Sequence, residues 1–275
     1  MIRALARLFR PRLALLNGMT ALAGCCLFPA PIQAATLPAA FCGVTLLAMG
    51  GSALNQMLER DIDALMTRTM LRPLPQGHLS ATAATLVGSC AILAGLALLA
   101  VIGDLLPSIL GVAALVWYLA VYTPLKRKTT LALPLGALCG AFPPLIGWCL
   151  AGGDPTDYRI IILAGLMFIW QIPHFWLLQE RHEADYRRAG IPLVDFRTIR
   201  SGRVSLFLIW LMAMTATTML LPALGGIERR IAPWFLLTAM IPFMTVTLRS
   251  DRLLFPSLSL FPLALTAILM LQKMI

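Results

Sequence analysis

Long apolar stretches recur along the whole chain, and each is long enough to cross a lipid bilayer as a helix. The hydrocarbon core of a bilayer is about 30 Å thick, and roughly 20 apolar residues span it as an α-helix. Because backbone polar groups must find internal partners in lipid, such stretches form helices rather than an open sheet. We mark about nine of them, over residues 13–32, 37–58, 81–102, 106–123, 131–151, 159–178, 204–222, 231–248 and 253–271. The sequence therefore predicts an all-α integral membrane protein, a bundle of about nine transmembrane helices that forms a single domain over residues 1–275.

Composition and charge exclude two other classes of protein. Hydrophobic residues make up 59% of the chain and charged residues 12%, about half the roughly 25% charged residues of soluble domains. The net charge of +10 would suit a nucleic-acid-binding protein, but the basic residues are distributed unequally between the two sides of the membrane. With the N-terminus in the cytoplasm, all of the 22 Lys and Arg residues except Arg159, Arg229, Arg230 and Lys273 fall on the cytoplasmic side. This positive-inside asymmetry predicts a multi-pass protein of a bacterial-type inner membrane with its C-terminus outside, and no nucleic-acid partner.

The start of the chain is similar in sequence to a lipoprotein signal peptide. An Arg-rich segment and an apolar stretch lead to Leu22-Ala23-Gly24-Cys25, which is similar to a lipoprotein processing site. We expect no cleavage there, because no soluble domain that would need an anchor follows.

A group of polar side chains lies at the cytoplasmic end of the second apolar stretch. Asn55, Glu59 and Asp63 are spaced i, i+4 and i+8, so on a helix they share one face, whereas Asp61 points to the opposite side. Two carboxylates and an amide oxygen are the hard ligands that Mg²⁺ uses together with substrate phosphates. We predict a metal site here that holds Mg²⁺ through a bound diphosphate, and Mn²⁺ suits the same ligands.

Two arginines follow this group at helical spacing. Arg68 and Arg72 are again i and i+4, and guanidinium groups are preferred partners of phosphate oxygens. The alternative is a solvated loop with local ion pairs. The acidic residues begin inside an apolar stretch, however, where an ionisable group is costly and indicates function. Asn55, Glu59 and Asp63 with the two arginines are therefore predicted to be catalytic residues that bind a diphosphate.

An aromatic segment with a histidine ends the sixth apolar stretch. Trp170, Gln171, His174 and Phe175 lie near the predicted lipid boundary. Neutral imidazole is a common metal ligand and proton carrier, and the rings would suit a flat aromatic substrate. A structural histidine beside an interfacial aromatic belt is the alternative interpretation. We predict that all four residues bind substrate.

Two further loops contribute candidates on the same side of the membrane. Asp185 could supply another carboxylate to the metal–diphosphate site, and Tyr186 beside it is included among the substrate-binding residues. Lys126 and Arg127 lie in the short basic loop 122–130. That loop anchors the topology, and its two cations could also reach a diphosphate if the loops converge.

Several segments together resemble one enzyme family. Residues 55–80 (NQMLERDIDALMTRTMLRPLPQGHLS) and 170–192 (WQIPHFWLLQERHEADYRRAGIP) resemble the two signatures of the UbiA-type prenyltransferases in their haem O synthase form. Residues 122–127 (YTPLKR), 140–148 (GAFPPLIGW), 10–16 (RPRLALL) and 254–261 (LFPSLSLF) are similar to further family segments. The chain departs from the family at residues 131–136 (LALPLG), where an asparagine is usual.

The resemblance implies a fold of nine transmembrane helices and a farnesyl transfer. A farnesyl group would pass from farnesyl diphosphate to a vinyl group of haem b, which is a substrate and not a cofactor. It also implies a contact with haem A synthase or with terminal oxidase assembly. By resemblance, Asn55, Glu59 and Asp63 take the metal–diphosphate positions and His174 belongs to the haem side. The cations implied to neutralise the diphosphate are Arg68, Arg72, Lys126 and Arg127.

Two alternatives remain open at this point. The same chemistry could act on a quinone-precursor or chlorin acceptor. A transporter or a non-catalytic haem-binding factor is the other class, and it would carry charged residues near the midplane of several spans. This chain keeps its charges at one face, which favours the enzyme.

Overall fold

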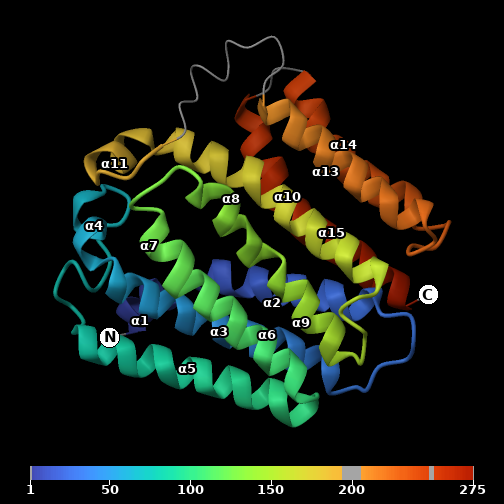
Figure 1. Ribbon diagram of the computed structural model, residues 1–275, viewed down its shortest axis with the longest axis horizontal. Coiled ribbons are helices and arrows are strands. Elements are labelled where there is room, and N and C mark those ends of the chain that lie inside the picture. The colour runs from blue at the N-terminus through green and yellow to red at the C-terminus, as the bar shows by residue number, and fades with distance from the viewer. Residues whose placement is uncertain (1, 194–205, 248–250, 275) are drawn as a thin grey trace.

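The protein is a bundle of helices that lie side by side (Figure 1). The computed structural model describes residues 2–193, 206–247 and 251–274, and these contain no strand. The elements are α1 (Ile2–Phe9), α2 (Pro11–Leu27), α3 (Thr36–Leu58), α4 (Arg60–Leu65), α5 (Ala81–Ile102), α6 (Leu105–Val116), the π-helix η1 (Trp117–Tyr122), α7 (Thr123–Leu125), α8 (Ala132–Ala137), the 3₁₀-helix η2 (Leu138–Gly140), α9 (Phe142–Leu150), α10 (Tyr158–Arg181), α11 (Glu183–Arg188), α13 (Leu206–Ala223), α14 (Ala232–Thr247) and α15 (Asp251–Met274). The predicted all-α class is confirmed.

In the described part of the chain, seven helical runs are long and apolar enough to cross a membrane, and each coincides with a predicted stretch. They are Thr36–Leu58, Ala81–Ile102, Leu105–Leu125, Ala132–Leu150, Tyr158–Arg181, Leu206–Ala223 and Leu253–Met274. The other two predicted stretches, 13–32 and 231–248, fall on α2 with 17 residues and α14 with 16. Helix α2 ends earlier than predicted because Phe28 precedes a proline and adopts an extended conformation.

Helix α2 lies at the centre of the bundle, where it packs against α3, α9, α10 and α15. Close approach of α2 and α9 depends on glycines that leave no space for a side chain. A Cβ atom on Gly24 would lie 1.9 Å from the carbonyl oxygen of Pro144, and one on Gly147 would lie 1.9 Å from that of Ala21. Small residues at a helix crossing allow this backbone contact in membrane proteins.

Replacing Gly147 by alanine is therefore expected to lower the thermal stability of the purified protein. The added methyl group meets backbone that cannot move aside locally, and such overpacking costs about 1–3 kcal/mol. Gly165→Ala is the matched control, because a Cβ on Gly165 in α10 meets nothing within 4 Å. Thermal unfolding in detergent compares the two variants, and equal melting temperatures would contradict this role of the α2–α9 contact.

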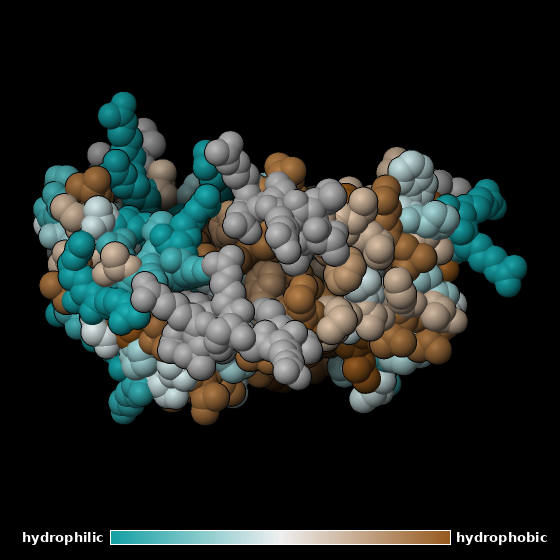
Figure 2. Space-filling view, turned by 90° about the horizontal axis from the view of Figure 1, so that it is seen from above, coloured by the Kyte–Doolittle hydropathy of each residue, from teal (hydrophilic) through white to brown (hydrophobic). Residues whose placement is uncertain are grey.

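Segments that were predicted to lie at the same end of the bundle contact one another. At one end the backbone N–H of Thr67 donates to Asp185 at 2.9 Å, and at the other Lys273 donates to the carbonyl of Phe28 at 2.7 Å. The chain begins at the first end and finishes at the second (Figure 1). Figure 2 shows hydrophilic side chains gathered mainly at the end that carries α4 and α11. Four of the predicted cytoplasmic arginines lie outside the described residues: Arg197, Arg200, Arg203 and Arg249.

Candidate active site

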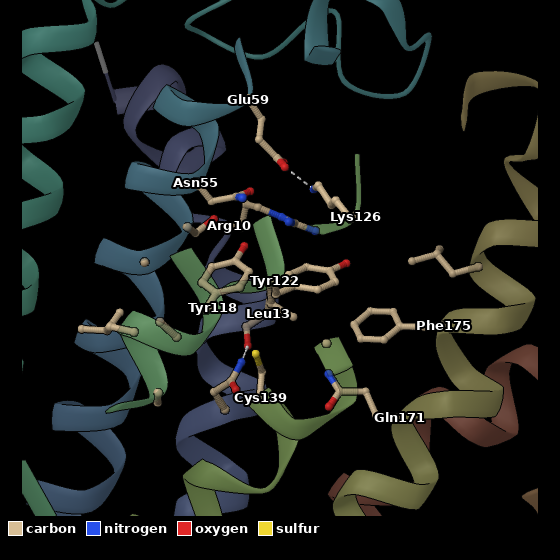
Figure 3. A pocket seen from close by; sticks show the side chains of 18 of the residues that line it. Arg10, Leu13, Asn55, Glu59, Tyr118, Tyr122, Lys126, Cys139, Gln171 and Phe175 are labelled. Atoms are coloured by element: carbon tan, nitrogen blue, oxygen red, sulfur yellow. Dashed lines mark hydrogen bonds and ion pairs between the residues drawn. The ribbon is translucent and has the colours of Figure 1, made fainter. Parts of the chain in front are cut away.

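A cavity opens among α2, α3, η1, α8, α9 and α10, and the loop after α4 closes its charged end. Figure 3 shows Asn55, Glu59 and Lys126 at that end, with Tyr118 and Tyr122 below them. The deeper walls on α3 and α6 are apolar and small, and include Val44, Leu47, Ala48, Gly111 and Leu115. The cavity thus joins a polar head region to an apolar arm.

The three predicted metal ligands all line this cavity. Asn55 belongs to the last turn of α3, Glu59 is the residue after that helix, and Asp63 lies in α4. Their exposed fractions are 4%, 2% and 3%. Buried carboxylates at a cavity wall require partners, so their counter-charges define the site.

Each buried carboxylate has a cationic partner from another segment. Glu59 forms an ion pair with Lys126, and Asp63 accepts a hydrogen bond of 2.5 Å from Nη1 of Arg72 (Figure 3 shows the first pair). Burial lowers the pKa of Lys126 below its ordinary value, although the Glu59 carboxylate opposes this shift. The acidic residues and the bases predicted to bind a diphosphate therefore neutralise one another.

Arg127 lies apart from this arrangement. It donates to both carboxylate oxygens of Asp61, at 2.7 and 2.9 Å, and to the carbonyl of Leu58 at 3.0 Å. The Asp61 side chain is exposed and that of Arg127 is partly exposed, and Arg127 is not among the described residues that line the cavity. Asp61 points away from Glu59 and Asp63, as the helical spacing predicts.

Arg10 is a cavity residue that the sequence reasoning missed. It joins α1 to α2 with φ 48° and ψ 61°, the one positive φ outside glycine among the described residues. Burial lowers the pKa of Arg10, although Tyr118 opposes the shift. Gln56, which is fully buried, donates to the carbonyl of Leu8 at 2.6 Å and so fixes the end of α1 before it. Such conformations cluster at functional sites, and the Arg-Pro pair ahead of an apolar stretch was the available signal.

Tyr118 and Tyr122 were also missed as site residues. Both belong to the π-helix η1, and their rings stack with centroids 6.1 Å apart at 17°. Lys126 lies 5.6 Å from the centroid of the Tyr122 ring. A Cβ on Gly136 would lie 2.4 Å from the Tyr122 ring, so the glycine allows the ring to lie against α8. Single π turns occur often at functional sites, but sequence periodicity does not reveal them.

Helix α10 divides the predicted aromatic cluster between two faces. Gln171 and Phe175 point into the cavity (Figure 3). Trp170 and His174 instead face α15. The His174 ring stacks between the rings of Trp170 and Phe255, with centroid distances of 5.0 and 5.3 Å. One residue along a helix turns the side chain by about 100°, and here that turn directs Gln171 to the cavity and Trp170 to α15, where its indole N–H donates to the carbonyl of Leu258.

Asp185 supports the site from outside the cavity wall. Its two carboxylate oxygens accept hydrogen bonds from the backbone N–H groups of Thr67 and Arg68, at 2.9 and 3.0 Å. Burial alone would raise the pKa of Asp185, but these bonds and Arg188 outweigh it and the pKa is lowered. Asp185 thereby fixes the loop that presents Arg68 to the cavity. Tyr186, the next residue, lines the cavity itself.

The donor atoms fit a metal that arrives with its substrate. Among the described residues no group of three or more His, Cys, Asp or Glu side chains could hold a metal ion by itself. Mg²⁺ does not require such a cage, because it is usually bound by one or two carboxylates together with substrate phosphates and water. Asn55, Glu59 and Asp63 offer only oxygen donors to such an ion, and these border the cavity that would hold the phosphates.

Comparison with known proteins identifies relatives along nearly the whole chain. The sequence model of the UbiA prenyltransferase family matches residues 17–269. A protein named "protoheme IX farnesyltransferase" from Geobacter sulfurreducens is 54% identical over 265 residues, covering 96% of this chain and 97% of that protein. A protein of the same name from Opitutus terrae is 34% identical over 272 residues, covering 95% and 92%.

Solved structures share the fold. The apo structure of a UbiA homologue from Aeropyrum pernix matches with a TM-score of 0.77 at 21% identity, covering 95% of this chain and 98% of that one. A UbiA homologue from Archaeoglobus fulgidus bound to GPP and Mg²⁺ matches with a TM-score of 0.75 at 15% identity, covering 99% and 100%.

Proposed function

The chain belongs to the UbiA prenyltransferase family, and on this premise we propose that it transfers the farnesyl group of farnesyl diphosphate to a vinyl group of haem b, making haem O. The observation that carries this proposal is the pairing of two buried acids with two partly buried bases at the head of the cavity. The relatives from Geobacter sulfurreducens and Opitutus terrae support haem as the acceptor by their names. The whole chain, residues 1–275, forms one transmembrane prenyltransferase domain.

The paired residues exchange partners when the donor binds. Lys126 and Arg72 turn from Glu59 and Asp63 to the diphosphate oxygens, and Arg10 and Arg68 supply further positive charge. The two carboxylates are then free for Mg²⁺ beside the amide oxygen of Asn55, and the same oxygens suit Mn²⁺. When bound, the metal stabilises negative charge on the departing diphosphate.

The transfer begins when the allylic C–O bond breaks and the diphosphate leaves with the electron pair. Tyr118 and Tyr122 present their rings below the diphosphate position, where a cation is stabilised by the negative faces of aromatic rings. The apolar arm keeps water away from the farnesyl cation, which water would quench. The vinyl carbon of haem attacks this cation. Water then adds to the resulting haem cation and loses a proton, which leaves a hydroxyl group.

Binding of the two organic substrates divides between the two sides of the cavity. The part of the α3–α6 arm that is lined by Val44, Leu47 and Gly111 is apolar and suits the farnesyl chain. On α10, Phe175 offers an aromatic ring and Gln171 an amide group to a flat acceptor. Trp170 and His174 act on the acceptor only through the position of α10, since they face α15.

A competition between acceptors tests the function. Purified protein is incubated with farnesyl diphosphate, Mg²⁺ and equal amounts of haem b and an aromatic acid such as a quinone precursor. We expect a haem heavier by a farnesyl group plus water in the mass spectrum, and none when a chelator removes the metal. A prenylated aromatic acid with unchanged haem would instead assign the chain to another acceptor.

We further propose nine membrane crossings in an inner membrane, with the active site and the N-terminus facing the cytoplasm. Helices α2 and α14 supply the two crossings beyond the seven long runs. The positive-inside distribution and the separation of the two termini support this orientation. Alkaline phosphatase fused after Ile275 is expected to be active in cells, since it would lie outside. Phosphatase activity from a fusion in the loop after Lys126, with none from the C-terminal fusion, would indicate the opposite orientation in the membrane.

A partner in the same membrane is the last element of the proposal. Haem O is too apolar to cross water freely, so the enzyme or assembly that consumes it, haem A synthase or a terminal oxidase, is expected to receive it within the bilayer. Cross-linking in native membranes tests this contact. Capture of neither partner, with full haem O production, would contradict it.

A further inference from the structure

The amide group of Asn55 has a defined orientation. Its side chain is 4% exposed and lines the cavity, and its Nδ2 atom donates to the hydroxyl oxygen of Thr123 at 3.0 Å. An amide presents two hydrogen-bond donors at one end and an acceptor at the other. Which end faces the cavity therefore decides whether Asn55 attracts or repels a cation.

The hydroxyl group of Thr123 fixes this choice. It donates to the carbonyl oxygen of Tyr118 at 2.8 Å, and a carbonyl oxygen can only accept. A hydroxyl group carries one proton, so once that proton is committed, only its lone pairs remain for Asn55. Asn55 must then turn its NH₂ end to Thr123, which leaves its carbonyl oxygen for the cavity.

The π-helix places Thr123 where it can act in this way. In an α-helix a threonine hydroxyl reaches the carbonyl four residues earlier. Here both the backbone N–H and the hydroxyl of Thr123 reach Tyr118, five residues earlier, at the end of η1. Thr123 is 3% exposed, and its hydroxyl group forms hydrogen bonds with Asn55 and Tyr118.

We infer that Thr123 is a positioning residue that keeps the oxygen of Asn55 directed at the metal of the donor complex. This inference rests on the proposed metal–diphosphate site and adds a residue outside it. Groups that orient a metal ligand typically change metal affinity by about 10- to 100-fold when they are removed. The effect should appear only when the metal is present.

The test compares Thr123→Val with Thr123→Ser. Valine keeps the shape but removes the hydroxyl group, whereas serine keeps it. Calorimetric titration with farnesyl thiodiphosphate, an analogue that resists ionisation, measures binding with and without Mg²⁺. We expect Thr123→Val to weaken binding about 10- to 100-fold in Mg²⁺ and to leave binding without metal unchanged. Thr123→Ser should bind as the wild type does in both conditions.

Two controls separate positioning from a structural effect. Thr218→Val removes an equally buried hydroxyl group, which donates to Met214 at 2.8 Å in α13, and should change neither titration. If Thr123→Val prevents folding, Thr123→Ala provides a smaller variant without the hydroxyl group. In an Asn55→Asp background, which has no NH₂ end to orient, Thr123→Val should have little further effect.

The outcomes also separate this inference from the proposed site. Wild-type protein that shows no Mg²⁺-dependent binding of the analogue would overturn both. Wild-type protein that shows such binding, with Thr123→Val equal to it, would overturn the positioning role alone. Equal weakening with and without metal would likewise reject positioning and leave a structural role.

Discussion

The substitution Asp63→Asn is expected to reduce haem farnesylation by at least about 10³-fold while the bundle remains folded. Asp63 is a buried carboxylate at the head of the cavity, and Asp63→Asn removes its charge but keeps its shape and an acceptor for Arg72. Loss of metal-assisted stabilisation of a leaving group is worth several kcal/mol, and each 1.36 kcal/mol changes the rate about tenfold. Initial rates at saturating farnesyl diphosphate and Mg²⁺ measure the effect.

Asp61→Asn is the matched control for this substitution. Asp61 lies two residues earlier, but it is exposed and pairs with Arg127 away from the cavity. Exposed ion pairs are worth only about 0–1 kcal/mol, so the control should keep nearly all of its activity. Asp63→Ala should be inactive as well, and it also leaves the Arg72 cation without its partner, so its melting temperature should fall. Wild-type activity in a folded Asp63→Asn protein would remove Asp63 from the donor site.

Lys126 and Arg127 are adjacent cations for which we expect opposite results. Lys126→Met should lower the rate by about 10²- to 10³-fold, because it removes a charge at the cavity wall that would neutralise the leaving group. Arg127→Met should lower it less than about tenfold, because that side chain is held by Asp61 at the surface. Steady-state rates of both variants, with melting temperatures measured in parallel, provide the comparison.

This pair also separates a local role from general electrostatics. Both substitutions change the net charge at this end of the bundle equally, so a diffuse attraction for the anionic donor would reduce both rates alike. Equal losses in the two variants would therefore contradict the assignment of Lys126 to the diphosphate. A larger loss in Arg127→Met would require the loop to rearrange when the donor binds.

The apolar stretches and the spacing of polar residues predicted most of the long helices and one wall of the cavity. Seven long helical runs coincide with predicted apolar stretches because lipid leaves an apolar segment few alternatives to a helix. The spacing of Asn55, Glu59 and Asp63 correctly predicts that they meet at one wall, because helical geometry continues through the short bend at Glu59. Their role as metal ligands stays a prediction.

Other features depend on contacts between segments, which spacing cannot supply. The pairing of Lys126 with Glu59, and of Arg127 with Asp61, joins residues more than 60 positions apart in the chain. Neighbours in a basic loop look alike in sequence, and only the fold separates Lys126, which lines the cavity, from Arg127, which pairs with Asp61 outside it.

Backbone irregularities account for most of the site residues that were missed. Arg10 reaches the cavity from a left-handed conformation that a non-glycine residue rarely adopts. Tyr118 and Tyr122 share a wall through a π-helix, whose period differs from that of the α-helix. His174 was grouped with Gln171 by proximity in sequence, whereas in the structure Gln171 lines the cavity and His174 packs against Phe255 of α15; its role in substrate binding stays a prediction.

The most direct test of the exchange of partners at the cavity head is a structure of the protein bound to farnesyl thiodiphosphate and Mg²⁺. We predict the diphosphate within hydrogen-bond distance of Lys126 and Arg72, with the metal beside Asn55, Glu59 and Asp63 and the farnesyl chain along α3 and α6. A diphosphate bound elsewhere, with the Glu59–Lys126 and Asp63–Arg72 pairs still intact, would contradict it.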